Sequence, residues 1–234
     1  RNRASLERLD MIVTEANQAG QDLRALLNSI LETRRLDQGI ENFTPQAVNV
    51  RDVIAVAVRL IDPREATMQD RELRIRVAPQ YEIWGDPVHL QQIFTNLISN
   101  AVKYSPPDAP VEVTAAPTMA LREVAGRRGR TETQSHRMME ILVRDYGLGI
   151  PPEQAPLLFQ RFARLPRDLA SKVVGNGLGL YLCRALAEVM GGKIWVESAG
   201  VPGKGSTFFV HLPVPPTEPV PPSVIETSKA EIRL

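Results

Sequence analysis

Two asparagines and a lysine are spaced so that they can share one face of a helix. Asn96, Asn100 and Lys103 are four and three residues apart within the segment from Leu90 to Pro107, and side chains at this spacing lie above one another on a helix. An amide oxygen can ligate a hard cation, and a lysine can bind phosphate. This face therefore predicts a site for a nucleotide with Mg²⁺. The alternative is an exposed face whose polar groups meet only water.

The segment that carries these residues predicts an amphipathic helix with one buried face. Its apolar residues recur at intervals of three and four, and they are Leu90, Ile93, Phe94, Leu97, Ile98, Ala101 and Val102. Asp86 is expected to cap this helix and Pro87 to occupy its first position, because an aspartate accepts hydrogen bonds from the free N–H groups of the first turn and proline tolerates that turn.

Shorter elements are predicted on both sides of this helix. Residues 48–61 favour another amphipathic helix, entered through Asn49 or Asp52 and closed by Asp62 and Pro63. Apolar alternation and turn residues predict the remaining elements: strands at 73–77, 81–84, 111–115, 139–143, 194–197 and 207–212, a short helical segment at 151–162, and a helix at 180–190.

A heptad seam opens the chain. Its members alternate steps of three and four, and they are Leu6, Leu9, Val13, Ala16, Gly20, Leu23, Leu27 and Ile30. One helix cannot bury such a face alone, so we expect a bundle completed by a second copy of the chain or by an upstream helix. The expected organisation is a bundle helix at 1–40, a linker at 41–47, a main domain at 48–213 and a proline-rich tail at 214–234.

Composition describes an ordinary globular protein. Of 234 residues, 43% are apolar and 24% are charged. The net charge of +1 does not bear on nucleic-acid binding, and no nucleic-acid partner is expected. The single Cys183 excludes a disulfide within the chain and is interpreted as a small core residue. No apolar run approaches the roughly 20 residues that cross a bilayer. We expect a cytoplasmic segment without membrane contact, cut from a longer protein whose anchor, if any, lies elsewhere.

An arginine-rich stretch interrupts the pattern between residues 117 and 137. Its arginines are Arg122, Arg127, Arg128, Arg130 and Arg137. Because clustered arginines cannot be buried unpaired, we interpret the stretch as an exposed hairpin extension. The alternative is a contact with an acidic partner.

Three glycine motifs follow the asparagine helix in order. They are Asp145-x-Gly147-x-Gly149 after a strand, Gly175-Asn176-Gly177-Leu178-Gly179 before a helix, and the turn from Gly203 to Phe208. Each motif alone is weak, since glycines commonly serve turns and helix caps. As an ordered set with the asparagine helix, they resemble the N, G1, G2 and G3 boxes of the sensor histidine kinases. Phe159 and Phe162 resemble the F box of that family.

This resemblance covers roughly residues 48–213. It implies an α+β fold, a two-layer α/β sandwich of a mixed sheet and three helices, which is the Bergerat fold of gyrase, Hsp90 and MutL. It also implies that the leading helix is the second helix of a dimerisation and histidine-phosphotransfer bundle, with Arg34-Arg35-Leu36-Asp37 at its usual end. The implied partners are ATP, Mg²⁺, an upstream helix that bears the acceptor histidine, a response regulator, and a second copy bound through the N-terminal helix.

The resemblance assigns one set of residues to the base. Asp145 would accept a hydrogen bond from the exocyclic amine of adenine and so select ATP, because a carboxylate cannot pair with the carbonyl of guanine. Gly147 and Gly149 would let the backbone pass close to the base. Tyr104 would lie along the adenine or ribose, with plain packing as the alternative, and Thr207 would touch the adenine side directly or through water.

A second set is assigned to the phosphates and the metal. Asn100 would bind Mg²⁺ with Asn96 beside it, and Lys103 would meet phosphate. Backbone N–H groups at the start of a helix favour anions, which implies a phosphate role for Gly175, Gly177, Leu178 and Gly179. Residues 163–174 would form a mobile lid over the nucleotide.

The residue at position 96 separates transfer from hydrolysis. In the gyrase and Hsp90 branch, a glutamate one helical turn before the metal-binding asparagine activates water. Asn96 cannot accept a proton near neutral pH, so transfer to an external nucleophile is expected. In the family this nucleophile is a histidine on the first bundle helix. The histidines here, His89, His136 and His211, all lie after the N-terminal helix, so we expect the acceptor upstream and no autophosphorylation of this fragment alone.

An alternative from another functional class is an assembly module that binds ATP, transfers nothing, and dimerises through its N-terminal helix. A Ser/Thr kinase of the same fold is less expected, because the leading helix would then have no explanation.

Overall fold

A computed structural model describes residues 43–61, 71–125, 131–169 and 177–216. It also describes six separate helical positions near the N-terminus, which are Ile12, Val13, Gly20, Leu23, Leu27 and Leu31. Most of the predicted heptad helix, the predicted helix closure at Asp62 and Pro63, Gly175, lid residues 170–174 and the tail beyond residue 216 lie outside the described residues. Within these residues, no helix is long and apolar enough to cross a membrane.

Five strands form a mixed sheet in the order β2-β4-β5-β7-β6. Their bounds are β2 (Leu73–Arg76), β4 (Val111–Ala125), β5 (Thr131–Arg144), β6 (Lys193–Glu197) and β7 (Thr207–Pro213). Strand β2 runs parallel to β4, and the other neighbours are antiparallel. Strands β1 (Gln46–Asn49) and β3 (Glu82–Gly85) pair separately as a two-stranded antiparallel sheet.

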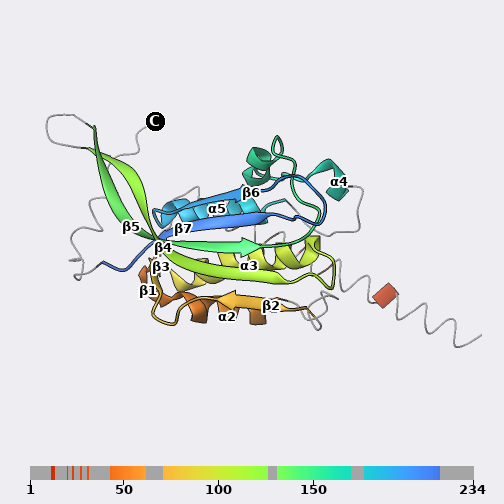
Figure 1. The fold of residues 1–234 in the computed structure, drawn as a ribbon, viewed down its shortest axis with the longest axis horizontal. Helices are drawn as coiled ribbons and strands as arrows, with labels where there is room; N and C mark the ends of the chain where they lie inside the picture. Colours follow the sequence, from red (N-terminus) through yellow and green to blue (C-terminus); the bar gives the residue numbers. More distant parts are fainter. Residues whose placement is uncertain are drawn as a thin grey trace, which may run out of the picture.

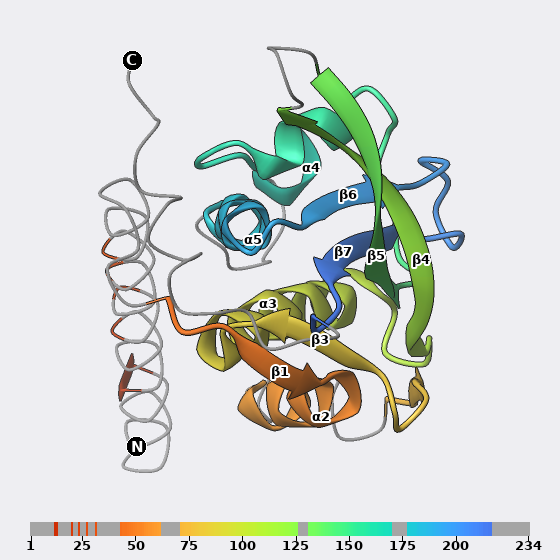
Figure 2. The ribbon, with the colours of Figure 1, turned by 90° about the vertical axis from the view of Figure 1, so that its left-hand side faces the viewer.

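Three helices cover one face of the five-stranded sheet. They are α2 (Val50–Leu60), α3 (Pro87–Tyr104) and α5 (Gly179–Val189), and Figure 2 shows them together on one side of the strands. The sheet residues that face them are buried, among them Val113, Ile141 and Val210. The predicted two-layer sandwich of a mixed sheet and three helices is therefore confirmed. Two short elements, the 3-10 helix η2 (Ala155–Phe159) and α4 (Pro166–Leu169), lie between β5 and α5 in the chain.

The central helix begins as the sequence predicts. Asp86 Oδ1 accepts hydrogen bonds from the backbone N–H groups of Val88 (2.9 Å) and His89 (3.3 Å), and Pro87 is the first helical residue. All seven apolar residues of the predicted stripe are buried. Because this face is fixed against the sheet, the polar residues of α3 must point elsewhere.

Two elements differ from the sequence prediction. The helix expected from residue 48 begins at Val50, with Asn49 as its cap, and Val48 belongs to β1, a strand that the sequence did not predict. Strand β4 continues to Ala125 rather than stopping near residue 115, and it pairs with β5 without a break until Ala125 faces Thr131. The extension is therefore a β-ribbon, which projects from the sheet in Figure 1. The predicted exposed hairpin extension is thus confirmed. The length of its strands was not predicted, because backbone pairing within a ribbon requires no alternation of buried side chains.

Candidate functional site

A cavity of about 170 Å³ brings together residues from all four sequence motifs. It is lined by α3, by the loop after β5, by the segment before and within α4, and by the start of α5. The predicted site residues that line it are Asn96, Asn100, Lys103, Tyr104, Asp145, Gly149, Gly177 and Gly179. Asp145 and Asn100 thus share one cavity although 45 positions separate them in the sequence.

Asn96 lies where α3 meets α5. A Cβ atom on Gly179 would come within 3.2 Å of Asn96 Oδ1. Cys183 is fully buried and donates from Sγ to the carbonyl of Ile93 at 3.7 Å. Burial raises the pKa of this thiol to about 12, although the side chain of Asn96 opposes the shift. The thiol is therefore an inert core group.

Asp145 is a buried carboxylate at the end of β5. Its side chain is 4% exposed, and Oδ1 accepts a hydrogen bond of 2.8 Å from the N–H of Gly147. Burial raises the pKa of Asp145; backbone hydrogen bonds from Gly147 and Ser206 and the positive charges of Arg167 and Arg144 oppose the rise. The cavity thus holds an acceptor that is poorly solvated and fixed in direction.

The loop after Asp145 can adopt its path only because two of its residues lack a side chain. A Cβ atom on Gly147 would lie 1.9 Å from the carbonyl oxygen of Tyr104, and Gly149 has a φ of +69°. Gly147 does not line the cavity. It packs against the end of α3 and thereby fixes the distance between the asparagine helix and Asp145.

The third glycine motif contributes residues other than the predicted one. Ser206 and Phe208 line the cavity, whereas Thr207 does not. Thr207 pairs with Arg144 on one side and Glu197 on the other, in the row of β7 positions opposite to the buried Phe208. Ser206, and not Thr207, therefore lines the cavity, while the predicted contact of Thr207 with adenine, directly or through water, stays a prediction. Strand side chains alternate between faces, so the burial of Phe208 already implied that position 206, and not 207, faces inward.

The second glycine motif is divided in the structure. Gly177 and Gly179 line the cavity, while Leu178 is buried at 1% exposure and accepts the first backbone hydrogen bond of α5 through its carbonyl. Gly177 has a φ of +70°, and a Cβ atom there would lie 2.6 Å from the carbonyl carbon of Phe162. The two predicted F-box residues differ in burial: Phe159 is buried, whereas Phe162 is 62% exposed.

Sequence reasoning missed two arginines that line the cavity. Arg164 and Arg167 come from the segment expected to be the lid, and Arg167 donates a hydrogen bond from Nη2 to the carbonyl of Gly149. This bond joins the lid segment to the loop that carries Asp145. The sequence signal that could have indicated them is the basic residue Arg164, two positions after the predicted F-box residue Phe162.

The residues of the cavity fit a magnesium ion that is held mainly by a nucleotide. No group of three or more His, Cys, Asp or Glu residues that could hold a metal occurs in the described part of the chain. Magnesium commonly takes only one or two protein ligands and completes its shell with phosphate and water oxygens. Asn100 lines the cavity, and its amide oxygen can serve as one such ligand.

Comparison with known protein families gives a match over most of this domain. Residues 85–216 match the family described as histidine kinase-, DNA gyrase B-, and HSP90-like ATPase. Among curated proteins, the sensor protein GacS of Pseudomonas syringae pv. syringae is 31% identical over 199 residues, which are 84% of this chain and 20% of GacS. The circadian input-output histidine kinase CikA of Thermosynechococcus vestitus is also 31% identical over 199 residues, covering 84% of this chain and 25% of CikA. The chain thus spans a quarter or less of these relatives.

Solved structures of histidine kinases are also similar to this chain. Full-length ShkA in complex with AMPPNP superposes with a TM-score of 0.63 at 26% identity, over 84% of this chain and 36% of that one. The mycobacterial sensor histidine kinase MprB superposes with a TM-score of 0.56 at 26% identity, over 74% of this chain and 100% of that one.

Proposed function

The chain belongs to the family of histidine kinase-, DNA gyrase B- and HSP90-like ATPases, and on that premise we propose that it is the ATP-binding catalytic region of a sensor histidine kinase. It would transfer the γ-phosphoryl group of ATP to a histidine outside this chain, for onward transfer to an aspartate of a response regulator. The observation that carries the proposal is the meeting of Asp145, Asn100 and Lys103 at one cavity.

The adenine end of the site is assigned to Asp145. Its carboxylate would accept a hydrogen bond from the exocyclic amine of the base, and its burial excludes competing water, which strengthens that bond. The hydroxyl of Ser206, beside Asp145 in the cavity, would provide a second polar contact. A guanine base presents a carbonyl oxygen at the same place, and two acceptors would then face each other.

The phosphate end is assigned to Asn100, Lys103 and the start of α5. Asn100 would hold Mg²⁺, which neutralises phosphate charge when bound. Lys103 would place its ammonium group against the phosphates. Arg164 is a further cation at this cavity and would face the triphosphate. Arg167 instead bonds to Gly149 and its charge acts on Asp145, so it belongs to the adenine end.

Phosphoryl transfer, rather than hydrolysis, follows from the lack of a base at position 96. A neutral imidazole nitrogen of the acceptor would attack the γ-phosphorus, the bond to the β–γ bridging oxygen would break, and ADP would leave. Asn96 cannot take a proton from water, because an amide is not a base near neutral pH. The chain's own residues therefore bind and orient ATP without activating water.

Dimerisation through the N-terminal helix remains part of the proposal. Val13, Leu23 and Leu27 belong to the predicted heptad seam, and each is between 52% and 58% exposed. Exposed apolar residues at this spacing favour a second helix as partner. We also place the segment in the cytoplasm, where ATP and response regulators occur.

The decisive experiment separates binding from transfer. The chain would be mixed with Mg-ATP and with a histidine-bearing helical bundle added in trans, and acid-labile phosphate on that bundle would be measured. Phosphate on the histidine, lost when that residue is changed to glutamine, supports the proposal. ATP binding without transfer to the acceptor favours the alternative of a non-transferring assembly module.

A further inference from the structure

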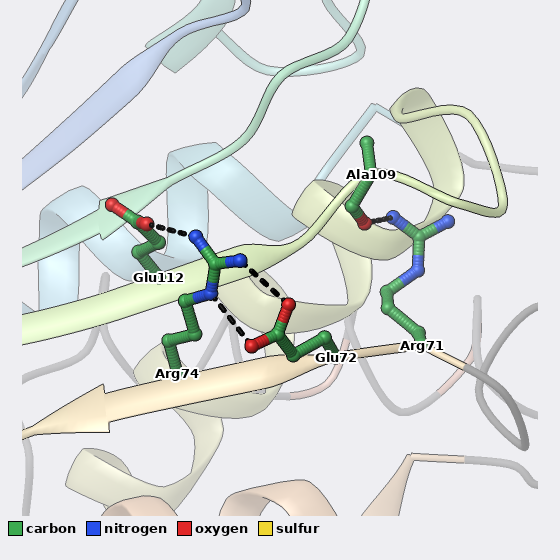
Figure 3. A network of polar contacts seen from close by, with 5 residues as sticks. All are labelled: Arg71, Glu72, Arg74, Ala109 and Glu112. Atoms are coloured by element: carbon green, nitrogen blue, oxygen red, sulfur yellow. Dashed lines mark hydrogen bonds and ion pairs between the residues drawn. The ribbon is translucent and has the colours of Figure 1, made fainter.

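The side chain of Arg71 is buried against the C-terminal end of α3, the helix that carries the predicted phosphate site. Arg71 itself lies just before β2 in the chain, and the residue is only 9% exposed. It donates to three backbone carbonyls, those of Ala109 (2.9 Å), Ser105 (3.2 Å) and Val102 (3.3 Å). Figure 3 shows its bond to Ala109, in the loop that follows α3.

These hydrogen bonds satisfy backbone carbonyl groups at and just after the C-terminal end of α3. The last four carbonyls of a helix have no partner within the helix, and a cation at this end is favoured by the helix dipole. The hydroxyl of Ser105 donates to the carbonyl of Ala101 (2.7 Å), and the guanidinium group of Arg71 donates to the carbonyl of Val102. Burial lowers the pKa of Arg71, and the charge of Asp108 opposes this shift. The cost of burying a cation is thus offset by several acceptors around the same helix end.

The last turn of α3 determines where two cavity residues stand. Lys103 and Tyr104 both lie in that turn and both line the cavity. The carbonyl of Tyr104 also faces Gly147, where a Cβ atom would come within 1.9 Å. A movement of this turn would therefore displace Lys103 and disturb the loop that carries Asp145.

We propose that Arg71 is a positioning residue for the phosphate end of the site: by binding the carbonyls of Val102, Ser105 and Ala109, it holds the last turn of α3 so that Lys103 meets the triphosphate. The inference rests on the proposed function, because it takes ATP as the ligand of the cavity.

Arg74 provides a matched control. It lies three positions further along the same segment, and its ion pairs are with Glu72 (2.6 Å) and Glu112 (3.1 Å) at the protein surface, as Figure 3 shows. Its side chain is 38% exposed. Replacing either arginine by methionine removes one positive charge and a similar side-chain volume, but only Arg71 holds the helix end.

The test compares dissociation constants for Mg-ATP and for adenosine, measured by calorimetry on the whole chain. Adenosine lacks phosphates, so a residue that acts through Lys103 affects ATP alone. Arg71→Met is expected to weaken ATP binding roughly tenfold, the equivalent of one weakened charge-assisted hydrogen bond. Adenosine binding should weaken by a clearly smaller factor, because Tyr104 and the loop of Asp145 also contact this turn. Arg74→Met is expected to change neither. In a Lys103→Ala background, Arg71→Met should weaken ATP binding only by the factor seen for adenosine.

Equal losses for ATP and adenosine, or additive losses of Arg71→Met and Lys103→Ala, would overturn the inference in favour of a purely structural role. If circular dichroism shows that Arg71→Met does not fold, Arg71→Lys carries the same comparison, because an ammonium group keeps the charge but cannot reach three separated carbonyls. A wild-type chain without preference for ATP over adenosine would refute the proposed function itself. A wild-type preference that Arg71 variants leave unchanged would refute only the role of Arg71.

Discussion

Asp145→Asn exchanges one carboxylate oxygen for an NH₂ group and leaves the shape of the side chain unchanged. The remaining oxygen can still accept the hydrogen bond of 2.8 Å from Gly147, which directs the new NH₂ group into the cavity. That group is a donor, and the exocyclic amine of adenine is also a donor. A hydrogen bond to a charged group contributes about 1.5–3 kcal/mol, so the dissociation constant for ATP should rise roughly 10- to 100-fold.

The same substitution should have the opposite effect on the stability of the empty protein. Burial raises the pKa of Asp145 above its unfolded value. A raised pKa means that the stabilising contribution is complete below the unfolded pKa of about 3.9 and is lost as the pH rises through the folded pKa. At neutral pH the folded protein therefore holds a charge that its surroundings disfavour, and asparagine removes it. The variant should melt at a higher temperature than the wild type, by a margin that grows as the pH rises above about 4.

Calorimetric titration with ATP, together with thermal melts of the empty protein across this pH range, tests both effects. Asp52→Asn is the control, because Asp52 is exposed on α2 and the substitution changes the net charge equally. Unchanged ATP affinity in Asp145→Asn would refute the assignment of Asp145 to the base. Lower stability at neutral pH would refute the account of its burial.

Three further substitutions test neighbouring parts of the site. Ser206→Ala should weaken ATP binding roughly fivefold, as expected for a neutral hydrogen bond of about 1 kcal/mol, while Thr207→Ala should leave ATP affinity unchanged. A loss of ATP affinity in Thr207→Ala but not in Ser206→Ala would assign the adenine contact to Thr207. Asn100→Ala should abolish the gain in ATP affinity that Mg²⁺ produces but preserve binding in EDTA, and an intact magnesium effect would exclude Asn100 as the metal ligand. Arg167→Ala removes a charge that lowers the pKa of Asp145, so the melting temperature of the empty protein should fall more steeply above about pH 4; a slope equal to that of the wild type would contradict this coupling.

Local chemistry made the centre of this site predictable from the sequence. The apolar stripe of α3 and its cap at Asp86 place the helix, and the spacing of Asn96, Asn100 and Lys103 then follows from helical geometry. Gly147 was predicted for close approach to the base, but it does not line the cavity, and the structure shows its close approach to Tyr104 instead. The contacts that place the asparagines and the lysine lie within one helix, whereas the contact of Gly147 joins two segments 43 positions apart.

The residues that were missed depend on contacts between distant segments. Strand β1 forms because β3 lies beside it. The predicted hairpin extension is paired along the described length of both strands, because each strand supplies the other's backbone partners. Arg71 meets Val102 across 31 positions of sequence. In the sequence it resembles the exposed arginines nearby, such as Arg74, and only the fold distinguishes the two.

The surroundings of Asn96 bear on the choice between transfer and hydrolysis. An ATPase needs at this position a side chain that can hold a water molecule and accept its proton. Here position 96 carries an amide, and the adjoining residue of α5 is Gly179, where an added Cβ atom would be within 3.2 Å of Asn96 Oδ1. Asn96 also lines the cavity, so a group that is not a base stands where a hydrolytic base would act. Under the proposed function, the proton acceptor would therefore come with the incoming nucleophile.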